Sequence, residues 1–223
     1  MTRMRTGRIS LAVAAFALTA AACSGADQRA GSDDAGSVRE FTEAAGKGLS
    51  LDYDPLASPR DAVRTADLVV SGTLAEVTDG IRFSGPAEQT AAFDDTYVTF
   101  VIEVEQVLAG TPGKSTTDTV HVAVSTGAGA GPERLSALNP QAKVVAVLDE
   151  VTTWRPGPRV TVQPPAGAET LYAAYTDGLW LQGGNDRQMY GISADRSALK
   201  PAWAGVDTVE EFAASLTRAA GDE

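Results

Sequence analysis

Residues Tyr97 to Leu108 read YVTFVIEVEQVL, and this stretch decides the fold class. Every second residue from Val98 to Val104 is apolar, and β-branched residues stand on both faces, which is typical of a strand with one buried side. We therefore expect Phe100 and Ile102 in the core. The alternation slips near Gln106, which indicates a β-bulge there, and bulges bend strands into barrels.

Further short strands with turn signals between them favour the same fold class. Asp177-Gly178, between two aromatic-rich runs, predicts a β-hairpin, and Ser58-Pro59 is typical of a helix start. The chain should therefore be mainly β: a small OB-like barrel or sandwich with a short N-terminal helix and a C-terminal helix. We expect strands over 67–77, 118–125, 143–148, 171–175 and 179–182, an edge strand at 160–162, a further strand at 189–192, and helices over 58–66, 132–138 and 207–220.

The first 22 residues have the pattern of a secretory signal peptide. Three arginines precede an apolar, alanine-rich run from Ile9 to Ala22. This run is shorter than the roughly 20 apolar residues that a membrane-spanning helix needs. We therefore assign residues 1–22 to a signal peptide and expect the mature protein to be exported.

Ala20-Ala21-Ala22-Cys23 resembles the lipobox of bacterial lipoproteins, with Ala20 in the place of the usual leucine. The resemblance implies cleavage before Cys23, attachment of a diacylglyceryl group to its sulfur, palmitate among the acyl chains, and anchoring to the extracytoplasmic face of the cell membrane. An ordinary signal peptide, cut after Ala-x-Ala, is the alternative. Cys23 is the one cysteine of the chain, so the body has no disulfide to stabilise it.

Residues 24–49 contain few large apolar residues, namely Val38, Phe41 and Leu49. Such a composition buries too little surface to offset the entropy of ordering, so we expect residues 23–50 to carry the lipid and form a flexible tether. Residues 51–223 should then form a single β-rich globular domain.

The head of the chain looks like the alanine-rich exported lipoproteins of high-GC Gram-positive bacteria. In the body, residues 66–74 (ADLVVSGTL) followed by residues 97–104 (YVTFVIEV) are similar to the first strands of OB-like barrels of the netrin and metalloproteinase-inhibitor type. The cysteines and the inhibitory N-terminal segment of those barrels are missing here. The resemblance therefore implies a fold and transfers no functional residue.

The charge of the chain limits its partners. The sequence has 18 basic and 29 acidic residues, and removing the three arginines before Cys23 leaves 15 against 29, a net charge of −14. A surface this acidic repels nucleic acid and anionic membrane surfaces. We expect no nucleic-acid partner, and contact with the membrane through the lipid on Cys23.

Few residues of the sequence indicate a catalytic, metal-binding or nucleotide-binding site. His121 is the only histidine, and strand parity points it away from the core, so we expect neither a hydrolytic triad nor a zinc site. Asn185-Asp186 or Asp94-Asp95 could offer oxygen ligands to calcium, but without regular spacing we expect solvated turns. The glycine-rich segment 127–132 lacks a nucleotide-binding pattern, and no cofactor is expected.

An aromatic group near the predicted hairpin is the one candidate ligand surface. Aromatic side chains can line a ligand groove, or they can fill a small barrel. The group comprises Tyr172, Tyr175, Trp180 and Tyr190. We expect a non-enzymatic binding or structural module of the cell envelope that takes a protein or small ligand. The alternative is a cell-surface hydrolase that uses a pair of carboxylates, as glycosidases do.

Overall fold

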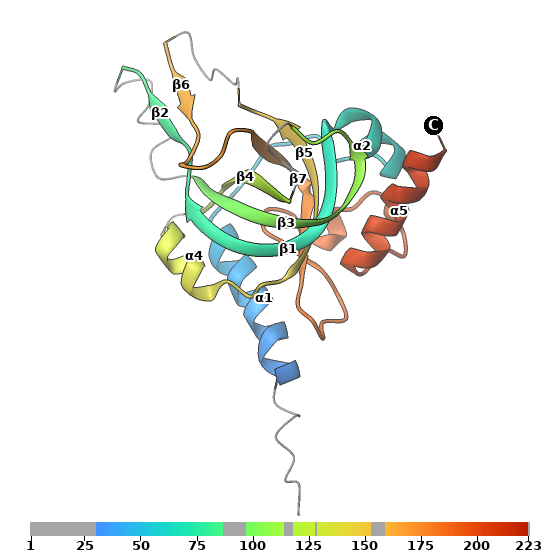
Figure 1. The fold of residues 1–223 in the computed structure, drawn as a ribbon. Helices are drawn as coiled ribbons and strands as arrows, with labels where there is room; N and C mark the ends of the chain where they lie inside the picture. The colour runs from blue at the N-terminus through green and yellow to red at the C-terminus, as the bar shows by residue number, and fades with distance from the viewer. Residues whose placement is uncertain (1–29, 87–96, 114–117, 128, 153–158, 223) are drawn as a thin grey trace, which may run out of the picture.

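The structure, a computed structural model, describes residues 30–86, 97–113, 118–127, 129–152 and 159–222, and within them the chain is mainly β (Figure 1). The strands are β1 (Leu68–Asp79), β2 (Arg82–Ser84), β3 (Tyr97–Gly110), β4 (Thr119–Ser125), β5 (Lys143–Glu150), β6 (Thr161–Gln163), β7 (Leu171–Gln182) and β8 (Tyr190–Gly191). The α-helices are α1 (Ala30–Gly46), α2 (Pro59–Thr65), α4 (Pro132–Leu138) and α5 (Val209–Gly221), and 3₁₀ turns cover Arg196–Ala198 and Pro201–Trp203.

Six strands form one sheet in the order β4-β3-β1-β5-β7-β8. Neighbours in this order are antiparallel, and β4 also pairs with β7 in parallel, with His121 opposite Leu171. The short strands β2 and β6 form a separate antiparallel sheet that projects from the body (Figure 1). The edge strand expected at 160–162 is therefore present, at 161–163.

The structure confirms the prediction for β3. Val98, Phe100 and Ile102 are at most 1% exposed. The register between β3 and β1 shifts twice around Gln106: Glu105 and Leu108, on either side of it, have no partner on β1. These bulges bend the strand and account for the slip in the apolar alternation.

Two cores lie on opposite faces of the sheet. On β5, Val144 and Ala146 belong to the core between the sheet, α1 and α4, whereas Val145 and Val147 belong to the core beneath α2 and α5. This two-sided burial confirms the expectation from the uninterrupted apolar run of that strand.

The predicted starts of the N-terminal helix α2 and the C-terminal helix α5 are confirmed. The Ser58 side chain caps α2, with Pro59 as its first residue. Thr208 caps α5 in a reciprocal capping box with Glu211, whose backbone N–H donates to the Thr208 hydroxyl over 3.2 Å. Among the described residues, no helix is both long and apolar enough to cross a bilayer.

The prediction of a flexible tether over 24–49 is wrong for Ala30–Gly46, which forms helix α1. Val38, Phe41 and Ala45 have no exposed surface, and all three belong to the core shared with the sheet. Their spacing of three and four residues is that of one helix face. Few apolar residues are enough here because Val38, Phe41 and Ala45 lie on the one face that packs.

The predicted hairpin at Asp177-Gly178 is also wrong. Residues 171–182 form one strand, β7, whose register with β5 shifts between the pairs Leu148–Ala174 and Ala146–Leu179. Residues 175–178, which lie between these pairs, have no partner on β5 and form a bulge in the ladder. Asp177 is only 1% exposed, and one of its carboxylate oxygens accepts a hydrogen bond from the backbone N–H of Leu56 over 3.0 Å. This long-range bond holds the segment as a bulge in place of a solvated turn.

Candidate functional site: a groove between helix α1 and strand β8

Helix α1 forms one wall of the candidate site, and it is held there by both side chains and backbone. The rings of Phe41 and Phe100 lie 5.6 Å apart at 45°, a favourable tilted contact. At the end of the helix, the backbone N–H of Gly127 donates to the carbonyl of Ala45 over 2.8 Å. The helix is therefore fixed to the sheet along its second half.

Gly46 allows α1 to approach the opposite wall closely. A Cβ atom at this position would lie 2.1 Å from the backbone carbonyl oxygen of Ile192, far inside any real contact distance. Only glycine fits without moving the helix away from the chain that follows β8. Gly46 and Ile192 are therefore the point where the two walls meet most closely.

Strand β8 and the turn after it form the other wall. Tyr190 pairs with Leu181 on β7, and the backbone N–H of Met189 donates to the carbonyl of Asp207 over 2.8 Å. The Asp195 carboxylate accepts from the backbone N–H of Ser197 over 2.8 Å and so caps the following 3₁₀ turn. Both walls are thus anchored to regular structure.

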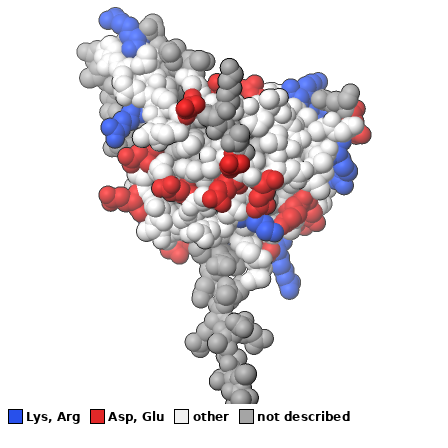
Figure 2. Space-filling model, viewed as in Figure 1, with Lys and Arg blue, Asp and Glu red and all other residues white. Residues whose placement is uncertain are grey.

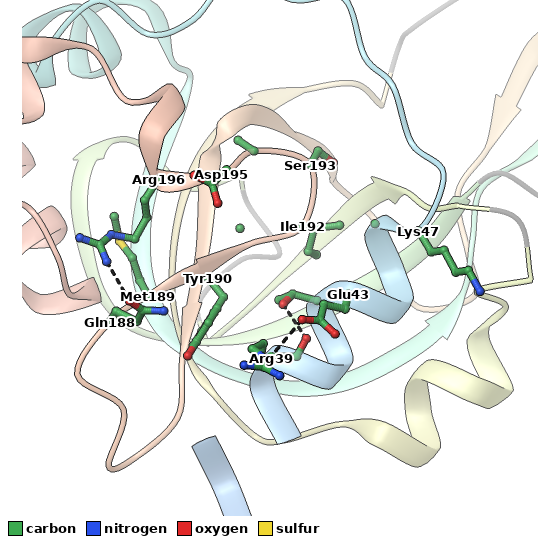
Figure 3. A pocket seen from close by; sticks show the side chains of 14 residues that line it. Arg39, Glu43, Lys47, Gln188, Met189, Tyr190, Ile192, Ser193, Asp195 and Arg196 are labelled. Carbon is green, nitrogen blue, oxygen red and sulfur yellow. Dashed lines mark hydrogen bonds and ion pairs between the residues drawn. The ribbon is translucent and has the colours of Figure 1, made fainter. Parts of the chain in front are cut away.

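Between these walls lies a groove of about 680 Å³, which we call groove 1. It is lined by residues 188–196, by Lys47, and by four residues of α1: Arg39, Thr42, Glu43 and Gly46. Figure 3 shows Arg39 and Glu43 projecting from α1, with Tyr190, Asp195 and Arg196 on the facing segment. Groove 1 therefore joins two segments that are far apart in the sequence.

Charges of both signs line groove 1. Arg39 pairs with Glu43 over 3.2 Å within the helix. Arg196 donates to Gln188 over 3.1 Å and also pairs with Asp207. These contacts position the two guanidinium groups and leave an open hollow rich in hydrogen-bond donors and acceptors.

The hydroxyl and backbone hydrogen bonds from Ser197 hold the pKa of Asp195 below its ordinary value. A carboxyl group that acts as a general acid needs the opposite shift. Ser193 contributes a hydroxyl to the lining, and among the described lining residues of groove 1 there is neither a histidine nor a cysteine. The arrangement is suited to holding a polar ligand by hydrogen bonds and charge.

The four aromatic residues of the predicted ligand surface do not line a common groove. Trp180 is fully buried, packs 6.2 Å from Phe212, and donates its indole N–H to the carbonyl of Asp177 over 2.7 Å. Tyr172 is 2% exposed and belongs to the other core, where its hydroxyl accepts from a backbone N–H over 3.1 Å. These two residues are core residues.

The other two aromatic residues are partly exposed, but they lie at separate places. The Tyr175 hydroxyl donates to the carboxylate of Asp149 over 3.0 Å, and burial together with this carboxylate raises the pKa of Tyr175. Tyr190 lines groove 1 and packs against the core beside α1. Of the predicted group, Tyr190 alone lies in the candidate site.

His121 faces away from the main core, as expected from the parity of β4. Burial lowers its pKa, and the nearby carboxylate of Glu76 partly opposes this shift. Within the described part of the chain, no three His, Cys, Asp or Glu side chains meet in a way that could hold a metal ion.

The calcium and lipid candidates fall in different parts of the chain. Asp186 forms a turn in which its carboxylate accepts from the backbone N–H of Gly183 over 3.4 Å. Cys23 and the Asp94-Asp95 pair lie outside the described residues.

Sequence reasoning missed the α1 wall of groove 1. The residues missed are Arg39, Glu43 and Lys47, which lie on the segment that the composition predicts to be a tether. The spacing of Val38, Phe41 and Ala45 was the available signal. Comparison of the chain with models of known protein families, with curated proteins and with solved structures found no match.

Proposed function

We propose that the protein is an exported lipoprotein, held on the extracytoplasmic face of the cell membrane by a lipid on Cys23, that serves as a non-enzymatic binding module of the cell envelope. The observation that carries the anchor is the position of Cys23. It is the one cysteine of the chain, and it follows a basic start, an apolar run and three small residues. A thiol at that place is suited to accept a lipid.

We further propose that the sheet closes into a small OB-like barrel. Support comes from the strand order β4-β3-β1-β5-β7 together with the parallel pairing of β7 back to β4. Helix α4 stands between β4 and β5 in the chain, and both cores are filled by side chains. A barrel of this size has a packed interior, so a ligand would bind on its surface.

Groove 1 is our candidate for that binding surface. Its lining combines cations and carboxylates with the Tyr190 ring, a combination suited to a polar ligand or to polar side chains of an envelope protein. The lowered pKa of Asp195 favours binding over acid catalysis at this place.

The anchor is tested by comparing the wild type with Cys23→Ala in the producing cell. We expect the wild type in the membrane fraction and the variant in the soluble extracytoplasmic fraction. Mass spectrometry of the mature wild type should show a chain that starts at residue 23 and carries the mass of a diacylglyceryl group. An unmodified Cys23, or equal membrane retention of both forms, contradicts the proposal.

Groove 1 is tested with two matched charge reversals. Lys47 lies in the groove and Lys200 lies outside it, and both side chains are exposed. After chemical crosslinking in membranes, we expect the species captured by the wild type to be retained by Lys200→Glu and lost by Lys47→Glu. If both variants capture the same species as the wild type, groove 1 is not the binding surface.

A further inference from the structure

Helix α1 changes the length of chain between the proposed lipid and the folded body. With a tether over residues 24–49, an extended chain of about 3.6 Å per residue would let the body move up to about 95 Å from Cys23. Because α1 begins at Ala30, the connection from Cys23 to the helix is seven residue steps, or at most about 25 Å. This connection from Cys23 to Ala30, which we call the leash, is about a quarter as long as the tether over residues 24–49 would be.

The leash is attached at one end of the molecule. From Ala30 to Val38, which has no exposed surface, α1 rises about 12 Å at 1.5 Å per residue. Groove 1 starts at the next residue, Arg39. In Figure 1 the start of α1 and the projecting β2–β6 sheet lie at opposite ends of the molecule. The end that bears α1 is therefore the one nearest the lipid.

The charge at this end agrees with closeness to a membrane. The described lining of groove 1 carries three cations, Arg39, Lys47 and Arg196, against two carboxylates, Glu43 and Asp195, and Asp207 beside the groove pairs with Arg196, so the charges there nearly balance. The mature chain as a whole carries almost two acids for each base. On the face shown in Figure 2, acidic residues predominate across the middle of the body. An anionic bilayer repels the acidic surface of the body. It repels groove 1 less, because cations there offset the carboxylates.

We infer that the short leash and the docked helix α1 together hold groove 1 toward the polar headgroup layer of the bilayer, with the β2–β6 sheet directed away from it. This inference rests on the proposed lipid anchor. The α1 end of the molecule then lies against the headgroup layer of the bilayer. Groove 1 meets its ligand at the membrane surface.

The lipidated protein allows a direct test with two matched labels. Lipid blocks Cys23, so a cysteine introduced elsewhere offers a unique thiol. Arg187→Cys places a fluorophore on the exposed segment beside groove 1, and Arg159→Cys places it on the exposed chain at the β2–β6 sheet. The purified full chain is reconstituted in vesicles that contain a nitroxide on the lipid headgroup, which quenches nearby fluorophores.

Flotation with the vesicles is measured first, and then quenching. We expect co-flotation, with the label at 187 quenched at least twice as strongly as the label at 159. Inserting twenty Gly and Ser residues after Asp27 should bring this ratio close to one. Co-flotation with equal quenching overturns the orientation and leaves the lipid anchor standing. A ratio unchanged by the insertion overturns the leash as its cause, and failure to float overturns the anchor and the orientation together.

Discussion

Replacing Phe41 by alanine tests whether helix α1 is part of the folded core. Phe41 has no exposed surface, and its ring contacts that of Phe100. Truncating a buried phenylalanine costs about 3–5 kcal/mol, and the lost ring pair places this site near 4 kcal/mol. Alanine is the strongest helix former, so the loss reports the docking of α1 and not its helicity.

Urea unfolding of the purified protein measures the effect. With a slope of about 2 kcal/mol/M, the midpoint should fall by about 2 M. Glu40→Ala, on the exposed side of the same helix, is the control and should change the free energy of unfolding by less than about 0.5 kcal/mol.

Helix α1 could also leave the sheet while the rest stays folded. In that case the 4 kcal/mol appears as an increase of about a thousandfold in amide hydrogen exchange over residues 38–46, measured by mass spectrometry. If Phe41→Ala changes the free energy of unfolding by less than about 1 kcal/mol and leaves this exchange as slow as in the wild type, the docking of α1 is refuted.

Three further changes should have defined effects. Gly46→Ala forces a methyl group against the Ile192 carbonyl and should cost about 1–3 kcal/mol in urea unfolding; a variant as stable as the wild type contradicts the close approach. Burial raises the pKa of Asp177, so the native state binds more protons than the unfolded state, and stability should fall as pH rises from the ordinary carboxyl pKa through the raised value. Asp177→Asn should remove this part of the slope of Tm against pH, and an unchanged slope contradicts the assignment. Thr208→Ala removes the cap of α5 and should lower stability by about 1 kcal/mol, whereas an unchanged Tm indicates that the capping box contributes nothing.

The elements found from the sequence are those whose pattern is local. The alternation in β3 and the cap of α5 each lie within about a dozen residues, and the structure confirms both. The bend near Gln106 was visible for the same reason, because two adjacent apolar residues interrupt the alternation.

The errors come from long-range contacts. Asp177-Gly178 has turn chemistry, but the carboxylate is buried by a bond to Leu56, far away in the chain. In α1, the composition of the whole segment indicates a tether, whereas the helical spacing of Val38, Phe41 and Ala45 indicates a face that packs. Groove 1 needs both α1 and β8, so no single segment of the sequence could predict it.

The seat of helix α1 also affects how the chain acquires its structure. The helix is made early, yet the carbonyl of Ile192 and the amide of Gly127 against which it rests are made much later. A nascent chain therefore cannot place the end of α1, at Gly46, against its final partners until the residues after strand β8 have been synthesised. Folding that must wait for such distant partners is slow, and it favours a chain that stays open until synthesis is nearly complete.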